Sequence, residues 1–181
     1  MSAALFIVKT LFDLYIITFL LRFAMQWVRA DFRNPLSQFI MRVTNPIVVP
    51  LRRIVPSWGG LDLATLVAGV LLELLATLVI LWMTPGGFPS IGPLLYWVLL
   101  RLIVTTLRLY FFLILVYVIL SWVSPGAYSP VTQVLASLTE PVLRPVRRIV
   151  PPIGGIDLSP LFVLIGLQAL IMLIPLPFTL A

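Results

Sequence analysis

The chain contains one proline- and arginine-rich segment twice. Residues 46–62 read PIVVPLRRIVPSWGGLD, and residues 141–157 read PVLRPVRRIVPPIGGID. Around this segment, 17 of the 40 positions in residues 27–66 are identical to those in residues 122–161, at a constant offset of 95 and without a gap. Most of the shared residues are proline, glycine, arginine, aspartate or tryptophan, which a common preference for apolar residues would not match. The chain is therefore an internal duplication, and we predict one repeat over residues 1–93 and a second over residues 94–181.

The composition is typical of a membrane protein. Of the 181 residues, 61% are hydrophobic and 10% are charged, whereas a soluble domain is about half apolar and about a quarter charged. The chain has no cysteine and no histidine, which excludes disulfides, thiolate nucleophiles, zinc and iron–sulfur sites, and imidazole acid–base catalysis. No constellation of acid, base and nucleophile can be named, so we expect no catalytic residue, no metal or cofactor site and no enzymatic activity.

Four apolar stretches reach or approach the length that crosses a bilayer. A helix needs about 20 residues to span a hydrocarbon core of about 30 Å. The 16 prolines lie between these stretches or at their edges, where proline does not interrupt a helix. The sequence therefore predicts an all-α polytopic membrane protein, with four transmembrane helices that form two hairpins, at residues 3–28, 61–83, 94–123 and 158–174.

The basic residues predict the orientation in the membrane. Loops 29–60 and 124–157 carry eight of the 12 basic residues, while residues 84–93 and 175–181 carry no charge. Because cytoplasmic loops are enriched in arginine and lysine, we expect both loops in the cytoplasm and both termini outside, with the protein in the cell (inner) membrane. The hairpins are then parallel repeats. The arginines alternate with apolar residues beside the spans, so we expect contact with anionic lipid headgroups and not with nucleic acid.

Each long loop predicts a short amphipathic helix at the membrane surface. Asn34-Pro35 and Ser129-Pro130 are each a helix N-cap followed by proline at the first helical position. We expect Pro46 and Pro141 to restart the chain, and the next proline to limit regular helix. After paired glycines, Asp62 and Asp157 are placed to cap the outgoing helices. The candidate surface for lipids, a membrane-protein partner or a second copy consists of Pro50, Arg52, Arg53, Pro145, Arg147 and Arg148.

Polar residues also occur inside the apolar stretches at equivalent repeat positions, where Asp13 aligns with Arg108 and Glu73 with Gln168. If the hairpins meet around a two-fold axis, equivalent positions face each other, so we expect an Asp13–Arg108 ion pair and a Glu73–Gln168 hydrogen bond. Lys9 lies one turn from Asp13 and is the alternative partner for it. Such pairs stabilise helix packing; an ion or proton path that uses Glu73 is the alternative. We expect Arg22, near the end of the first stretch, to extend to the interface.

These motifs resemble the YggT family. The resemblance rests on NPLSQF at 34–39, TNP at 44–46, PLRRIVP at 50–56 and GGLD at 59–62, with a second copy at 129–130, 139–141, 144–151 and 154–157. It implies a bacterial two-repeat, multi-pass membrane protein without an established biochemical activity. Such relatives are associated with osmotic-stress tolerance and ion homeostasis, and some with cell division. Plastid relatives, named YlmG, are associated with nucleoid distribution and assembly of a cytochrome.

The resemblance favours a non-enzymatic scaffold or assembly factor that acts through its two loops under osmotic stress. The alternative is an oligomeric channel or transport component, with an ion path lined by Asp13, Glu73, Arg108 and Gln168.

Reporter fusions test the predicted orientation. A reporter that is active only outside the cytoplasm should be active after Ala181 and within residues 84–93, and inactive within loop 29–60. A fluorescent protein that matures only in the cytoplasm should give the reciprocal pattern. Cytoplasmic activity after Ala181 would overturn the predicted orientation.

Overall fold

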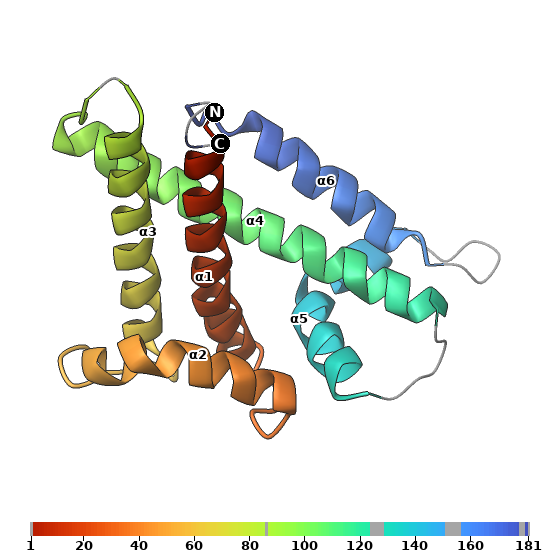
Figure 1. Ribbon diagram of the computed structural model, residues 1–181. Coiled ribbons are helices and arrows are strands. Elements are labelled where there is room, and N and C mark those ends of the chain that lie inside the picture. Colours follow the sequence, from red (N-terminus) through yellow and green to blue (C-terminus); the bar gives the residue numbers. More distant parts are fainter. Residues whose placement is uncertain (1, 86, 124–128, 151–156, 178–179, 181) are drawn as a thin grey trace.

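The computed structural model is all-helical over the residues it describes, which are 2–85, 87–123, 129–150, 157–177 and 180. This part contains six helices, and it confirms the predicted all-α class (Figure 1). The first repeat comprises α1 (Ala3–Trp27), α2 (Pro35–Leu51) and α3 (Leu63–Met83). The second repeat comprises α4 (Ile91–Val123), α5 (Pro130–Arg147) and α6 (Ser159–Leu173).

Three of the described helices are long and apolar enough to cross a membrane. They are α1 with 25 residues, α3 with 21 and α4 with 33. The apolar helix α6 has 15 residues, which at about 1.5 Å per residue is about 22 Å, less than the hydrocarbon thickness of about 30 Å. A fourth crossing over residues 158–174 therefore stays a prediction. Helix α4 is longer than the hydrocarbon is thick, so it must tilt or project from it.

The two hairpins pack through equivalent residues. In the first repeat, the three helices meet around Phe19, Val48 and Ala68. In the second, they meet around Ile114, Leu143 and Val163, each 95 residues later. The partly buried neighbours follow the same offset, in the pairs Tyr15/Tyr110, Ile47/Val142 and Leu51/Val146. The repeat in the sequence is thus a repeat in the packing, with the same helix faces turned inward.

The amphipathic helices α2 and α5 begin as predicted, with proline at the first helical position after a capping side chain. Asn34 Oδ1 accepts a hydrogen bond from the Leu36 N–H at 2.9 Å, and Ser129 Oγ accepts one from the Thr132 N–H at 3.1 Å. Contrary to the predicted restart, both helices run unbroken through their internal prolines. These prolines are four residues apart and exposed, so the carbonyls that lose an N–H partner lie on an outer face that can be hydrated.

The turn into α3 is the predicted glycine pair. Gly59 and Gly60 have φ angles of 59° and 82°, a left-handed conformation that glycine adopts without strain. The backbone N–H groups of Trp58 and Leu61 each bond to the other residue's carbonyl, at 3.1 and 2.9 Å. The equivalent residues 154–155, and Pro151 before them, lie outside the described part of the chain.

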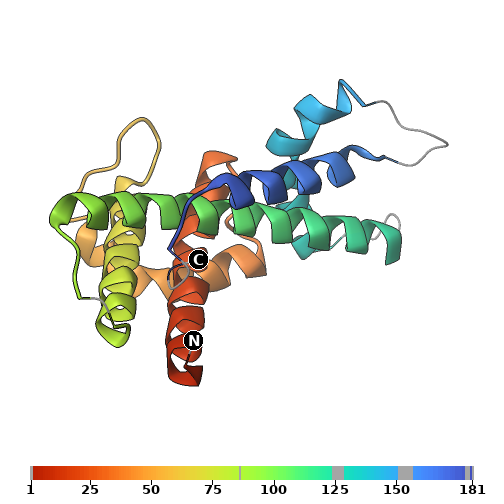
Figure 2. The ribbon, with the colours of Figure 1, turned by 90° about the horizontal axis from the view of Figure 1, so that it is seen from above.

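The second repeat meets the first through α4 and α5. Helix α4 crosses α1 and α3, and α5 contacts α1 and α2 (Figures 1 and 2). A buried cluster that includes Met25, Ile40, Val134 and Leu138 joins α1 and α2 to α5. Within the described residues, α6 contacts only α4 and α5 of its own repeat. The contact between repeats is therefore one-sided, because α4 covers α3 and α1 does not cover α6.

Candidate functional site

A buried arginine connects three helices at the centre of the molecule. Arg101 of α4 is 2% exposed, and its Nη2 donates a hydrogen bond to Asp13 Oδ1 of α1 at 2.7 Å. Its Nε donates to Oε1 of Glu73 on α3, a residue that is fully buried. One guanidinium thus binds a carboxylate from each long helix of the first repeat and attaches the second repeat to both. We refer to Asp13, Glu73 and Arg101 as the arginine triad.

The arginine triad lies far from the helix ends. Glu73 is ten residues from Leu63 and ten from Met83, or about 15 Å from each end at about 1.5 Å per residue. At the centre of a membrane-spanning helix, a lone charge costs about 2.5–3.5 kcal/mol on insertion scales, and such charges persist where they pair with one another. The triad provides that pairing, since both carboxylates are hydrogen-bonded to the same guanidinium.

The pairs predicted from the repeat register are not formed. Asp13 pairs with Arg101 instead of Arg108, and Glu73 pairs with Arg101 instead of Gln168. The physical reason is the crossing of α4 over α1 and α3, which brings Arg101 to both carboxylates, together with the absence of contact between the described parts of α3 and α6. Arg108 is half-buried and Gln168 is exposed, and neither side chain makes a hydrogen bond or ion pair within the described residues.

Arg101 was missed because the repeat comparison considered only positions that are polar in both halves. Its equivalent in the first repeat is Phe6. The signal that could have identified Arg101 is its own place in the sequence, ten residues into the long apolar helix α4. An ionisable residue there requires a partner, whatever its repeat equivalent is.

A second charge cluster, centred on the buried Asp62, joins α2 to the start of α3. Asp62 is 1% exposed and accepts hydrogen bonds from Arg52 Nε at 3.1 Å and from the Thr65 hydroxyl at 2.7 Å. The guanidinium of Arg22 lies 3.8 Å from the same carboxylate. Asp62 occupies the predicted N-cap position of α3, but its side chain accepts no backbone hydrogen bond from that helix. The predicted capping contact is therefore wrong at this position, because the two arginines and Thr65 engage the carboxylate instead.

Arg22 turns into the molecule and does not extend to the interface as predicted. It is 3% exposed, and its Nη1 donates to Thr44 Oγ1 at 2.6 Å and to Asn45 Oδ1 at 2.9 Å. Both acceptors belong to α2. Arg22 therefore binds α1 to α2, while the neighbouring aspartate supplies the compensating charge.

The second repeat has a comparable cluster that is more open. Arg147 donates from Nε to Asp157 Oδ2 at 2.8 Å and from Nη1 to Glu140 Oε2 at 2.7 Å. Asp157 Oδ1 also accepts the backbone N–H of Ser159, the first residue of α6, at 2.9 Å. Asp157 thus contacts the start of α6, although Leu158 and not Asp157 occupies the N-cap position of this helix. The three charged side chains are between 33% and 50% exposed, so solvent weakens these ion pairs more than those at Asp62.

The residues of the predicted lipid and partner surface divide into two groups. Arg52 and Arg147, which are 45% and 33% exposed, form ion pairs with Asp62 and Asp157. Pro50, Arg53, Pro145 and Arg148 are exposed, as are Arg42 and Arg144 of the same two helices. These last four arginines make no hydrogen bond or ion pair within the part of the chain that the structure describes. Among the described residues, no three acidic side chains gather where they could hold a metal ion.

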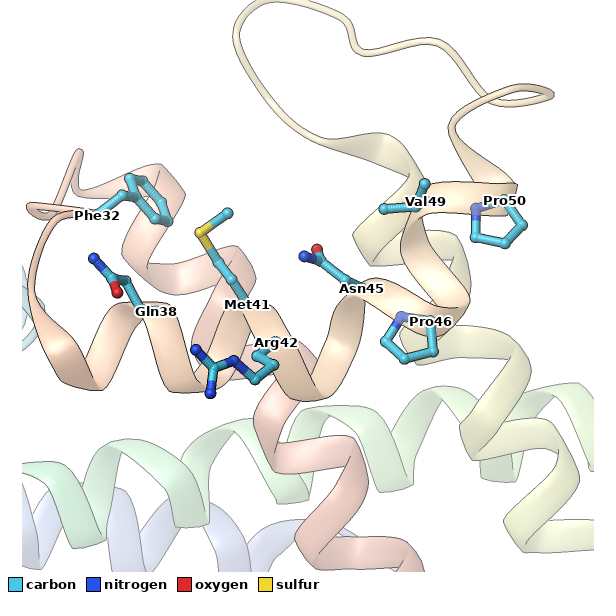
Figure 3. Close-up of a pocket in the computed structure, with 8 residues that line it drawn as sticks. All are labelled: Phe32, Gln38, Met41, Arg42, Asn45, Pro46, Val49 and Pro50. Atoms are coloured by element: carbon cyan, nitrogen blue, oxygen red, sulfur yellow. The ribbon is translucent and has the colours of Figure 1, made fainter.

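A groove of about 740 Å³ runs along the outer face of α2. Figure 3 shows its lining spread along the helix, with Phe32 at one end and Pro50 at the other. A single guanidinium, that of Arg42, stands among apolar and amide side chains. The outer face of α2 is thus mixed, with apolar and amide side chains beside one guanidinium. The lining comprises Phe32, Gln38, Met41, Arg42, Asn45, Pro46, Val49 and Pro50.

Breaking the arginine triad is expected to destabilise the helix bundle. Arg101→Gln removes the guanidinium that both carboxylates bind, and removing one partner of a buried ion pair costs about 3–5 kcal/mol. Arg108→Gln removes an arginine of the same helix that forms no ion pair with the described residues, so it should change the stability little. Unfolding of the full chain in detergent micelles measures both variants. Equal losses for the two variants would contradict the assignment of Arg101.

The cluster at Asp62 predicts a pH-dependent contribution to stability. Burial alone would raise the pKa of Asp62, but hydrogen bonds from Arg52 and Thr65 and the charges of Arg52 and Arg22 outweigh it, so the pKa lies below its ordinary value. A carboxyl with a lowered folded pKa stabilises the fold above its unfolded pKa and loses that effect as the pH falls through the folded pKa. The stability difference between the parent and Asp62→Asn should be full at pH 7 and shrink below about pH 4. A difference that stays constant down to pH 3 would count against this electrostatic role.

Comparisons with known proteins agree with the duplication. The family model described as CCB3/YggT matches residues 1–83 and 96–178, two segments that begin 95 residues apart. An uncharacterized protein of Pseudomonas aeruginosa is 46% identical over 96% of this chain and 88% of its own length. The uncharacterized protein YggT of Escherichia coli (strain K12) is 41% identical over 94% of this chain and 88% of its own length.

A plastid relative matches one part of the chain. YlmG homolog protein 2, chloroplastic, of Arabidopsis thaliana is 33% identical over 37% of this chain and 26% of its own length. No solved structure matches the chain. The matched family model covers both repeats and the bacterial relatives extend over nearly the whole sequence, so the chain belongs to the CCB3/YggT family.

Proposed function

We propose that this protein is a non-enzymatic scaffold of the cell (inner) membrane, which supports the envelope under osmotic stress by presenting an arginine-bearing platform to the cytoplasmic surface. The platform consists of α2 and α5 with their four outward arginines, Arg42, Arg53, Arg144 and Arg148. The observation that carries the proposal is that an arginine–aspartate pair ties each of these helices to the start of the following apolar helix. The outer face of the platform is thereby held in a fixed position.

The two faces of the platform helices have opposite chemistry. Ile40, Thr44 and Val48 of α2 are buried, and the equivalent residues of α5 are buried too. The outward side carries the free arginines and the prolines at positions 46, 50, 141 and 145. A basic side chain near an anionic leaflet contributes about 1 kcal/mol of attraction. The platform therefore fits anionic lipid headgroups, and it leaves a proline-rich surface for a membrane-protein partner or a second copy.

The proposal takes both loops as cytoplasmic, both termini as external and α6 as a fourth crossing. The arginine-rich loops and the uncharged residues 84–93 support this orientation. Helix α6 is short, but the apolar Leu158 precedes it and Ile174 and Leu176 follow it. A bilayer accommodates a short span by local thinning at a modest energetic cost.

The arginine triad supports a scaffold more than an ion path through a single chain. The two carboxylates of the predicted path, Asp13 and Glu73, are both bonded to Arg101. A permeating cation would have to displace this guanidinium from two carboxylates at once. Paired charges of this kind are expected where helices must be held together.

The platform is tested by replacing its four free arginines together. The variant in which glutamine replaces Arg42, Arg53, Arg144 and Arg148 should insert normally. Its preference for anionic over zwitterionic lipid should fall at least about tenfold, since each charge near the leaflet contributes about 1 kcal/mol. It should also fail to protect cells from osmotic shock. Quenching of tryptophan fluorescence by brominated lipids in bilayers measures the lipid preference. Survival of a deletion strain that expresses the variant measures the protection.

The matched control replaces the same four arginines by lysine. It keeps the charge and should retain both the lipid preference and the protection. If the glutamine variant protects cells as well as the parent does, the platform is not the basis of function.

A further inference from the structure

The second repeat has polar residues at the two positions that correspond to the triad carboxylates, but no described residue that binds them both. At the offset of 95, the two carboxylates that bind Arg101, those of Asp13 and Glu73, correspond to Arg108 and Gln168. We call these two residues the second-repeat site. The hairpins pack through equivalent residues, such as Phe19 and Ile114 or Ala68 and Val163. Arg108 and Gln168 therefore occupy, on α4 and α6, the positions that the triad carboxylates occupy on α1 and α3.

The helix face that carries this site is open. In the first hairpin α4 covers the corresponding face, and Glu73 and Thr77 are both 0% exposed. In the second hairpin Gln168 is exposed, and Met172, the equivalent of Thr77, is 76% exposed. The same helix face is thus buried in the first repeat and exposed in the second.

Nothing within the described chain takes the place of Arg101 at the second-repeat site. By the repeat symmetry, the covering helix would be α1 and the residue in the place of Arg101 would be Phe6. Helix α1 does not contact α6 within the described residues, and Phe6 is 57% exposed. Its ring carries no charge that would neutralise a guanidinium.

Positive charges outnumber negative charges in the inner parts of the long helices. In the inner parts of the long helices, Lys9, Arg101 and Arg108 face two carboxylates, so the described helices carry one excess positive charge there. Lys9 lies within electrostatic range of both carboxylates and of both arginines. The two carboxylates are engaged by Arg101, whereas the guanidinium of Arg108 has no ion pair with any described residue. An isolated cation inside a bilayer marks a missing partner.

The geometry points to a docking site for the transmembrane helix of a different membrane protein, one that carries an aspartate or glutamate near the middle of its span. The carboxylate would pair with Arg108 and accept a hydrogen bond from the Gln168 amide. In the arginine triad a cation lies between two carboxylates; here a carboxylate would lie between a cation and an amide. The apolar flank of α6 around Met172 would pack against the same helix. This inference rests on the proposed scaffold function and identifies the chemistry of the partner.

A second copy of this chain does not fit the site. Its intramembrane carboxylates, those of Asp13 and Glu73, are already bonded to its own Arg101. The other acidic residues, Asp31, Asp62, Glu140 and Asp157, lie in or beside the loops. A second copy therefore offers no free carboxylate at the depth of Arg108.

Model transmembrane peptides test the site on the full chain. Because the chain has no cysteine, Ser90→Cys allows a single donor fluorophore to be attached. Leucine-based helical peptides of about 20 residues, with Glu, Gln or Leu at the central position, carry the acceptor in phosphatidylcholine bilayers. Energy transfer should show at least tenfold tighter binding of the Glu peptide than of the Gln and Leu peptides. Arg108→Gln should abolish this preference.

The controls separate this site from the rest of the molecule. The four-arginine glutamine variant of the platform should bind the Glu peptide as the parent does, so a failure of the platform and a failure of this site are told apart. The comparison of Glu and Gln peptides on the unchanged protein needs no variant to fold. No preference for Glu in the parent, or a preference that persists in Arg108→Gln, would overturn the inference. Competition by an unlabelled second copy, to the same extent as by the Glu peptide, would overturn it too.

Discussion

A guanidinium in the middle of three apolar helices has to be neutralised where it lies, and this constraint governs how the two repeats meet. Asp13 and Glu73 lie on neighbouring helices, and each is ten residues from the start of its helix. One arginine can bind both only if its helix crosses the two of them. Helix α4 does so, and at 33 residues it is long enough to contact both helices of the first repeat and still pack in its own. The one-sided contact between the repeats follows from this crossing.

The helices and their starts were predictable because local chemistry decides them. Asn34 and Ser129 before proline give helix starts that the structure reproduces, since capping and the fixed φ of proline act within a few residues. The unbroken course through Pro46 and Pro50 was not predictable from proline alone. It depends on the placement of both rings on an exposed face, where the unpaired carbonyls can be hydrated.

The sequence predicted that the buried charged residues need partners, but it did not predict which residues those partners are. That Asp13 and Glu73 need partners follows from the cost of a charge in hydrocarbon. That the partner is Arg101 depends on how two helices cross, which no local pattern encodes. The assumption of two-fold symmetry selected Arg108 because it treats the repeats as interchangeable. The contacts of α3 with α4, and the lack of contact of α6 with α1 in the described residues, show that they are not.

The two repeats differ in their charged residues both at the loops and at the centres of the long helices. At the loops, the first repeat places two arginines, Arg22 and Arg52, against Asp62, while the second places Arg147 against two carboxylates. At the centre, the first repeat presents two carboxylates and the second presents an arginine beside an amide. A duplication that kept its residues would have had like charges at every equivalent position, and its halves would have repelled each other wherever those positions met. The second repeat instead binds the carboxylates of the first through Arg101, whose equivalent is the uncharged Phe6. Because each repeat has a single such face and the contact is one-sided, the face of the second repeat stays open. Arg108 on that face has no ion pair with the described residues, and a carboxylate from outside the chain is the partner that we propose for it.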